Sequence, residues 1–130
     1  MLTFDFYLDP ALTTPVEAAL QFVQDDAGPA AVDKVVWFGS RDATRQCLPD
    51  GGTDVLVQAT GAGAGDVALA TSAIDLESAV PGAALSLGAI CYGGLENVIP
   101  IYLRVLDTSH TVGVRAVTIT TNDLAEYLIE

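Results

Sequence analysis

The sequence predicts an all-β protein, an antiparallel sandwich of about seven to nine strands. The clearest pattern lies in residues 97–121, where apolar residues alternate first with Tyr102 and Arg104 and then with Thr118 and Thr120. A period of two is typical of strands with one buried face. Roughly eight such runs, separated by turn signals at intervals of about a dozen residues, indicate a sandwich, with a barrel as the alternative.

The two runs in residues 97–121 are joined by the turn-forming residues 107–110 (Asp-Thr-Ser-His). This arrangement predicts a long antiparallel hairpin that forms the last pair of strands of the sandwich. The apolar residues change parity between Ala116 and Val117. One extra residue would reconcile the two halves, so we expect a β-bulge near Gly113–Ala116.

The other elements follow from the same alternation and from turn residues. In residues 14–23, Thr14, Pro15 and Glu17 match the start of a short helix, but the alternating apolar residues and the β surroundings favour a strand over 18–23. One helical turn is expected within 72–82, before Pro81 and Gly82. No linker or internal repeat divides residues 1–130, which we take as a single domain. The further strands are predicted over residues 2–8, 32–38, 46–48, 54–60, 66–71, 84–90 and 98–106.

The run 32–38 (VDKVVWF) is apolar on both faces, which suits a central strand covered on both sides or one that lies against a partner. The single tryptophan, Trp37, is predicted to anchor the core. Cys47 and Cys91 lie far apart in the sequence without the spacing of a zinc site. The sequence favours a pair of buried free thiols over one disulfide.

The charge balance excludes several classes of partner. Seventeen acidic and five basic residues give a net charge of −12, which argues against nucleic-acid binding and against docking on anionic lipid. The N-terminal segment lacks the basic region of a signal peptide, and no apolar stretch is long enough to span a membrane. We therefore expect a soluble protein made in a cytoplasm.

No set of residues predicts an active site or a cofactor. His110 is the only histidine, and its neighbours Asp107 and Ser109 lie on the same predicted turn, where triad geometry is rarely achieved. We interpret His110 as an exposed turn residue. Acidic loops at Asp25-Asp26, at Asp50 with Asp54, and at Asp75 with Glu77 could offer oxygen ligands to Ca²⁺, but none has EF-hand spacing.

Outward aromatic residues are the better candidates for function. Tyr7, Tyr92, Tyr102 and Tyr127 fall at outward or loop positions, and tyrosine provides large contact area at little entropic cost. The C-terminal segment is unusually apolar for a chain end. It either folds back over its own sandwich or lies against a neighbouring subunit, by strand addition or as a hydrophobic plug. The interface candidates are Tyr102, Arg104, Leu124, Tyr127, Leu128 and Ile129.

The stretch from Leu85 to Val105, LSLGAICYGGLENVIPIYLRV, resembles an immunoglobulin-like module in its order of strands and Gly-Gly turn. With the following DTSHTVG and TITTN, and more loosely VVWFGS at residues 35–40, it is similar to small structural proteins of tailed bacteriophages and their prophages. The resemblance implies an immunoglobulin-like sandwich. Because Trp37 precedes both cysteines, the resemblance does not imply the inter-sheet disulfide of antibody domains.

The resemblance also implies a function. We expect a non-enzymatic component of a virion, in the tail, baseplate or capsid decoration, assembled in the host cytoplasm. Its expected partners are other virion proteins and copies of itself, without nucleic acid, membrane or cofactor. The alternative is a calcium- or carbohydrate-binding adhesive module that uses the acidic loops and the outward tyrosines.

Overall fold

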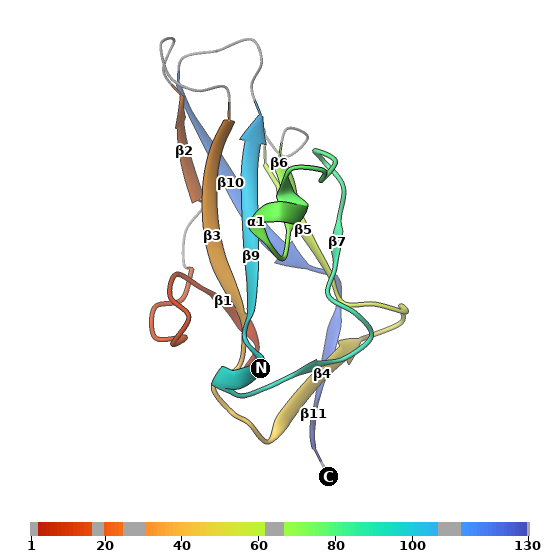
Figure 1. The fold of residues 1–130 in the computed structure, drawn as a ribbon. Coiled ribbons are helices and arrows are strands. Elements are labelled where there is room, and N and C mark those ends of the chain that lie inside the picture. The colour runs from red at the N-terminus through yellow and green to blue at the C-terminus, as the bar shows by residue number, and fades with distance from the viewer. Residues whose placement is uncertain (1–2, 17–19, 25–30, 62–66, 107–112, 130) are drawn as a thin grey trace.

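Four strands form the first sheet, in the order β1-β3-β9-β6, with every pair antiparallel. The computed structural model describes residues 3–16, 20–24, 31–61, 67–106 and 113–129. The long strands of this sheet, β3 and β9, run side by side, and helix α1 lies in front of β9 (Figure 1). The bounds are β1 (Asp5–Tyr7), β3 (Ala31–Gly39), β9 (Ile99–Leu106), β6 (Val67–Ala70) and α1 (Ala73–Leu76).

The second sheet has the order β2-β10-β5-β7 and the third the order β11-β4-β8, again with antiparallel pairs only. The described residues thus form three sheets and eleven strands, which confirms the all-β prediction. The bounds in the second sheet are β2 (Leu20–Gln24), β10 (Gly113–Thr121), β5 (Leu56–Thr60) and β7 (Leu85–Ser86). Those in the third are β11 (Leu124–Leu128), β4 (Arg45–Pro49) and β8 (Cys91–Tyr92), with a 3₁₀ turn, η2 (Leu95–Asn97), after β8.

One cluster of buried side chains draws on all three sheets. Phe38 comes from the first sheet, Val57 and Val117 from the second, and Cys47 from the third. Phe38 also contacts the rings of Phe4 and Phe6, with centroid distances of 5.9 and 5.1 Å. The three sheets therefore share one main hydrophobic core, and a smaller second cluster lies around Leu76 of α1.

The expected hairpin of residues 97–121 is wrong. β9 pairs with β3 and β6 in the first sheet, whereas β10 pairs with β2 and β5 in the second. Two strands that are consecutive in sequence thus cross from one sheet to the other. Alternation predicts that each run is a strand with a buried face, but it carries no information on which strand is its neighbour. β10 is also not the end of the fold, because β11 follows it.

The expected bulge is also absent from the described part of β10. Residues 113–117 pair with residues 24–20 of β2 without a break, and residues 118–121 then pair with residues 60–57 of β5. The strand changes its hydrogen-bonding partner at this point instead of inserting a residue. The change of parity in the sequence therefore coincides with a change of neighbour.

Trp37 is not the core anchor that the sequence predicts. It lies on the outer face of β3, half-buried, beside Tyr7 and opposite Pro100. Its neighbour Phe38 is 2% exposed and occupies the core instead. Because β3 has apolar residues on both faces, its sequence does not show which face is buried. In the structure, the buried face is the one that Phe38 shares with Phe4 and Phe6.

Most other predicted elements are confirmed, with shifted ends. The ambiguous segment forms strand β2, the polar stretch 39–53 contains β4, and one helical turn follows β6 as α1. The strand expected over 84–90 is reduced to the two residues of β7, and β8 was not predicted. The three sheets are separate, so the barrel alternative is not observed among the described strands.

Gly93 should tolerate no side chain. A Cβ there would lie 2.1 Å from the Asp42 carbonyl oxygen and 3.0 Å from that of Arg45. Because both obstacles are backbone atoms, Gly93→Ala should lower the free energy of unfolding by about 2–3 kcal/mol in a urea titration. Gly52→Ala is the control, since its Cβ would meet Pro49 at an ordinary 3.6 Å. Equal stabilities of the two variants would contradict the expected clash.

Candidate interaction surface

The outer face of the third sheet carries a row of two tyrosines and a glutamine. The register places Tyr127 of β11 and Tyr92 of β8 on either side of Gln46 of β4. Directly paired residues of antiparallel strands point to the same face. Leu48 and Ala125 form the next pair on this face, two residues further along.

Ile129 extends this face, since its N–H donates to the Thr44 carbonyl (2.7 Å) and so continues the ladder with β4. Tyr127, Tyr92 and Ile129 are 54%, 47% and 39% exposed. None of these outward residues is charged, although the chain has a net charge of −12. Acidic residues follow beyond the pair of Leu48 and Ala125, where the Asp50 N–H donates to the Asp123 carbonyl. We call this surface the uncharged face; it consists of Gln46, Leu48, Tyr92, Ala125, Tyr127 and Ile129.

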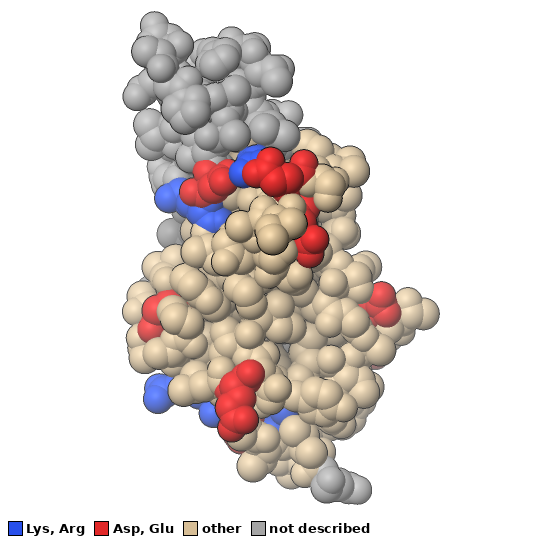
Figure 2. Space-filling model, viewed as in Figure 1, with Lys and Arg blue, Asp and Glu red and all other residues tan. Residues whose placement is uncertain are grey.

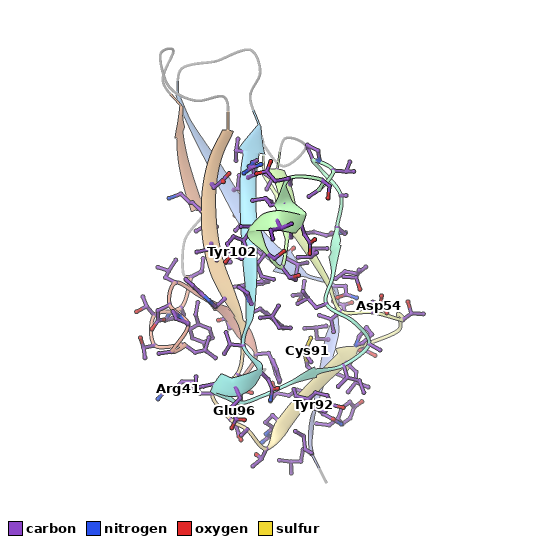
Figure 3. All side chains as sticks on the ribbon, in the orientation of Figure 1. Arg41, Asp54, Cys91, Tyr92, Glu96 and Tyr102 are labelled. Carbon is purple, nitrogen blue, oxygen red and sulfur yellow. The ribbon has the colours of Figure 1, made fainter. Side chains whose placement is uncertain are left out.

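The opposite side of the same sheet is buried around Cys47 and becomes exposed toward Leu128. Cys47 and Cys91 are 0% and 3% exposed, and the side chain of Glu126, opposite Cys47, is 6% exposed. In Figure 3, Cys91 and Tyr92, neighbours on β8, can be followed on the two sides of this sheet. The face that meets the core and the face that carries the tyrosines are thus clearly distinguished.

Glu126 ties β11 to the N-terminal segment. Its Oε1 accepts hydrogen bonds from the Thr3 N–H (2.6 Å), the Thr3 hydroxyl (2.9 Å) and the Phe4 N–H (3.2 Å). Its Oε2 lies 3.9 Å from Arg45 Nε. These contacts hold the strand that carries Tyr127 in place from its inner side.

The second edge of β11 has no strand beside it among the described residues. Asp50 N–H donates to the Asp123 carbonyl (2.8 Å), and Ile129 N–H donates to Thr44, so the odd-numbered residues face β4. The backbone groups of Leu124, Glu126 and Leu128 therefore point to the open edge, by strand alternation. Such an edge can accept another strand.

The structure places the interface candidates of the C-terminal segment in different environments. The segment is a strand on its own chain, as one of the two alternatives proposes, and Tyr127 and Ile129 share its outer face. Leu124 packs against the core, whereas Leu128 is 59% exposed at the end of the strand.

Tyr102 and Arg104 lie on a different sheet from these residues. They share the outer face of β9, as the alternation predicts, but both have partners within the chain. The Arg104 Nε and Nη2 donate to the two oxygens of Asp33 (2.8 and 2.9 Å), and Nη2 also donates to Glu77 (3.2 Å). The guanidinium lowers the pKa of Asp33. Tyr102 packs against the cluster around Leu76 of α1.

This part of the surface differs from the uncharged face. Acidic and basic side chains lie side by side in a band over the upper part of the view in Figure 2. Beside Tyr102, a shallow pocket of about 240 Å³ is lined by Asp33, Lys34, Val35, Ala73, Leu76 and Tyr102. Because Arg104 already pairs with two carboxylates, it offers little free charge to a partner.

A second pocket, of about 490 Å³, lies between β1 and the loop after β3. In it, the Ser40 hydroxyl donates to Thr3 Oγ1 (2.7 Å) and accepts from the Asp42 N–H (3.1 Å). Burial and the nearby Asp5 raise the pKa of Tyr7, so its phenol stays protonated. Ser40 has no direct contact with a carboxylate among these hydrogen bonds, since the Thr3 hydroxyl lies between it and Glu126 Oε1. The pocket is lined by Thr3, Asp5, Tyr7, Pro15, Ser40, Arg41 and Asp42.

The structure bears on the metal hypothesis only within its described ranges, and it does not describe the histidine. Within the described ranges, no three His, Cys, Asp or Glu side chains gather where they could hold a metal ion. Asp54 accepts a hydrogen bond from the Ser86 hydroxyl (2.7 Å). His110, with Asp107 and Ser109, and the pair Asp25-Asp26 lie outside the described residues. No helix in the described part of the chain is long and apolar enough to cross a bilayer.

Comparison of the chain with protein families, curated proteins and solved structures finds no match. The class of protein therefore rests on the fold and on the surface of the third sheet. The sequence missed this surface because β8 is only two residues long and shows no alternation. The signals that the sequence did offer were Tyr92 among the outward tyrosines, and Tyr127 and Ile129 in the C-terminal segment.

Proposed function

We propose that this chain is a non-enzymatic structural protein that assembles through protein–protein contacts. The observation that carries the proposal is the uncharged face. Interface centres are depleted in charged residues and enriched in aromatic ones, and this face shows both properties on a strongly acidic chain. Tyr92 and Tyr127, both about half exposed, are the expected anchors.

The open edge of β11 supports the same proposal. A neighbouring strand that pairs with Leu124, Glu126 and Leu128 would extend the third sheet into the partner. It would also bring a second set of outward side chains beside Tyr127. Backbone pairing would then set the register between the two chains, while the tyrosines would contribute most of the surface buried in the interface.

The assembly that fits best is a virion of a tailed bacteriophage, in its tail, baseplate or capsid decoration, with the chain present in several copies. The resemblance of residues 85–105 to phage structural proteins supports this assignment. The small size of the chain, its β fold and its docking face also fit a component of such an assembly. We also propose that the sandwich is immunoglobulin-like. Consecutive strands β9 and β10 in different sheets around one core support that assignment.

The double substitution Tyr92→Thr with Tyr127→Thr tests the face. Threonine suits a strand and keeps the backbone, so the melting temperature should stay within a few degrees of wild type. The dissociation constant of the oligomer should rise at least about tenfold for each lost anchor. Light scattering after size exclusion, over a range of concentrations, measures the mass against the 13.5 kDa of one chain.

Leu8→Thr is the matched control, because Leu8 is 48% exposed but lies outside the uncharged face. It should leave the mass of the assembly unchanged. A wild-type chain that is monomeric at every concentration, and an antibody against it that never labels tailed particles, would together refute the proposal.

Carbohydrate binding is a second candidate, on one specific observation. Tyr92 and Tyr127 flank Gln46 on strands about 10 Å apart, twice the strand spacing. Two aromatic side chains thus stand on either side of an amide that can bond hydroxyl groups. Binding of the monomeric wild-type chain to a glycan array, lost in the double variant, would favour this function over assembly.

A further inference from the structure

Cys47 and Cys91 are brought directly opposite each other on β4 and β8. Both are free thiols, and they are 0% and 3% exposed. Opposed residues of an antiparallel pair have Cα atoms about 4.5–5.5 Å apart, within the range of about 4.4–6.8 Å that a disulfide bridges. The two sulfurs thus lie where a bond between them would require little movement of the backbone.

We propose that Cys47 and Cys91 are an oxidisable pair that closes to an intrachain disulfide on reaction with a low-molecular-weight disulfide such as oxidised glutathione. This inference does not depend on the proposed assembly function. It also differs from the inter-sheet bridge of antibody domains, because both cysteines belong to one sheet.

The surroundings of the two thiols determine which one reacts first. The Cys47 thiol donates to the Cys91 sulfur, which lowers the pKa of Cys91 and raises that of Cys47. Burial and the carboxylate of Glu126 also raise the pKa of Cys47. Cys91 also lies on the two-residue edge strand β8, whereas Cys47 lies on the central strand β4 and is 0% exposed. Cys91 is therefore the thiol that reacts first, after loss of its proton.

Access to Cys91 is through the edge of the sheet. β8 has only two residues and pairs on one side alone, with β4. Directly after β8, the Gly93 N–H donates to the Arg45 carbonyl (2.8 Å) and the Gly94 N–H donates to the Ser40 carbonyl (2.7 Å). A short edge strand opens locally at small cost, which admits the oxidant.

The reaction balances in two exchange steps. The Cys91 thiolate attacks one sulfur of oxidised glutathione, forms a mixed disulfide and releases one glutathione thiolate, which takes up the proton lost by Cys91. The Cys47 thiol then loses its proton and attacks the Cys91 sulfur, and the second glutathione leaves and is protonated. Two protein thiols are oxidised, and one glutathione disulfide is reduced to two thiols.

The disulfide would close the chain between residues 47 and 91 into a loop that contains β5, β6, α1 and β7. A cross-link over a loop of this length restricts the unfolded chain and raises the melting temperature by about 10 °C. It would also fasten β8, and with it Tyr92, to the third sheet.

The test uses the full chain, reduced and then exposed to oxidised glutathione under native conditions. We expect an intact mass lower by two hydrogen atoms, no thiol that reacts with Ellman's reagent after denaturation, and a higher melting temperature that reductant reverses. Cys47→Ala should stop at a glutathione adduct on Cys91, whereas Cys91→Ala should gain little adduct.

Three results would overturn the proposal, and two need no variant that might fail to fold. They are two thiols that stay free in the folded wild-type chain, an oxidised product that links two chains, and an adduct on Cys47 in preference to Cys91.

Discussion

Phe38→Ala should lower the free energy of unfolding by about 3–5 kcal/mol, which is a large share of the total stability of one domain. Phe38 is 2% exposed and contacts Phe4 and Phe6, so alanine would leave a cavity in the core beneath β1 and β3. Because the core is shared by three sheets, the walls of this cavity cannot collapse independently. Urea titration followed by circular dichroism measures the loss.

Trp37→Ala is the matched comparison, one residue away on the same strand. Trp37 is half-buried on the outer face, so its removal should cost about 1–2 kcal/mol, clearly less than that of Phe38. If Trp37→Ala proved the more destabilising substitution, the assignment of the two faces of β3 would be wrong.

Glu126→Ala should cost about 2–4 kcal/mol, because it removes the acceptor of three hydrogen bonds that join the third sheet to the N-terminal segment. The N–H groups of Thr3 and Phe4 would lose their partner. Arg45 Nε, which is buried without a hydrogen bond, would also lose a charge 3.9 Å away. Thermal and urea unfolding at neutral pH measure the change.

The substitution Glu126→Gln distinguishes the contribution of the hydrogen bonds to stability from that of the negative charge. Glutamine keeps an oxygen that can accept from Thr3 and Phe4, so its cost should be smaller than that of alanine. Glu96→Ala, at an exposed position of η2, should change stability by less than about 0.5 kcal/mol. Similar losses for Glu126→Ala and Glu96→Ala would show that the Glu126 contacts contribute little to the fold.

Local alternation was enough to predict most of the strands and one buried face. Ile101, Leu103 and Val105 are all buried, while Tyr102 and Arg104 share the outer face, as the period of two requires. The same rule placed Tyr127 and Ile129 on one face of a strand. These features follow from side chains that alternate along an extended chain, which is a property of each segment alone.

Strand partners were decided only by the tertiary structure. β9 and β10 look like a hairpin in sequence, yet they belong to different sheets. β4 lies between the C-terminal strand and β8, which come from distant parts of the chain. Pairing depends on which apolar faces close around the common core, and this information is spread over all the strands.

The candidate surface depends on that pairing. Tyr92, Gln46 and Tyr127 are remote in sequence and form one row only because β4 lies between β8 and β11. The same register brings Cys47 opposite Cys91 on the buried side. Composition and alternation by themselves determined that this chain is an acidic all-β protein with outward tyrosines. Which tyrosines share a face, and which thiols meet, was decided by long-range strand pairing, because residues distant in sequence become neighbours only when the sheets form.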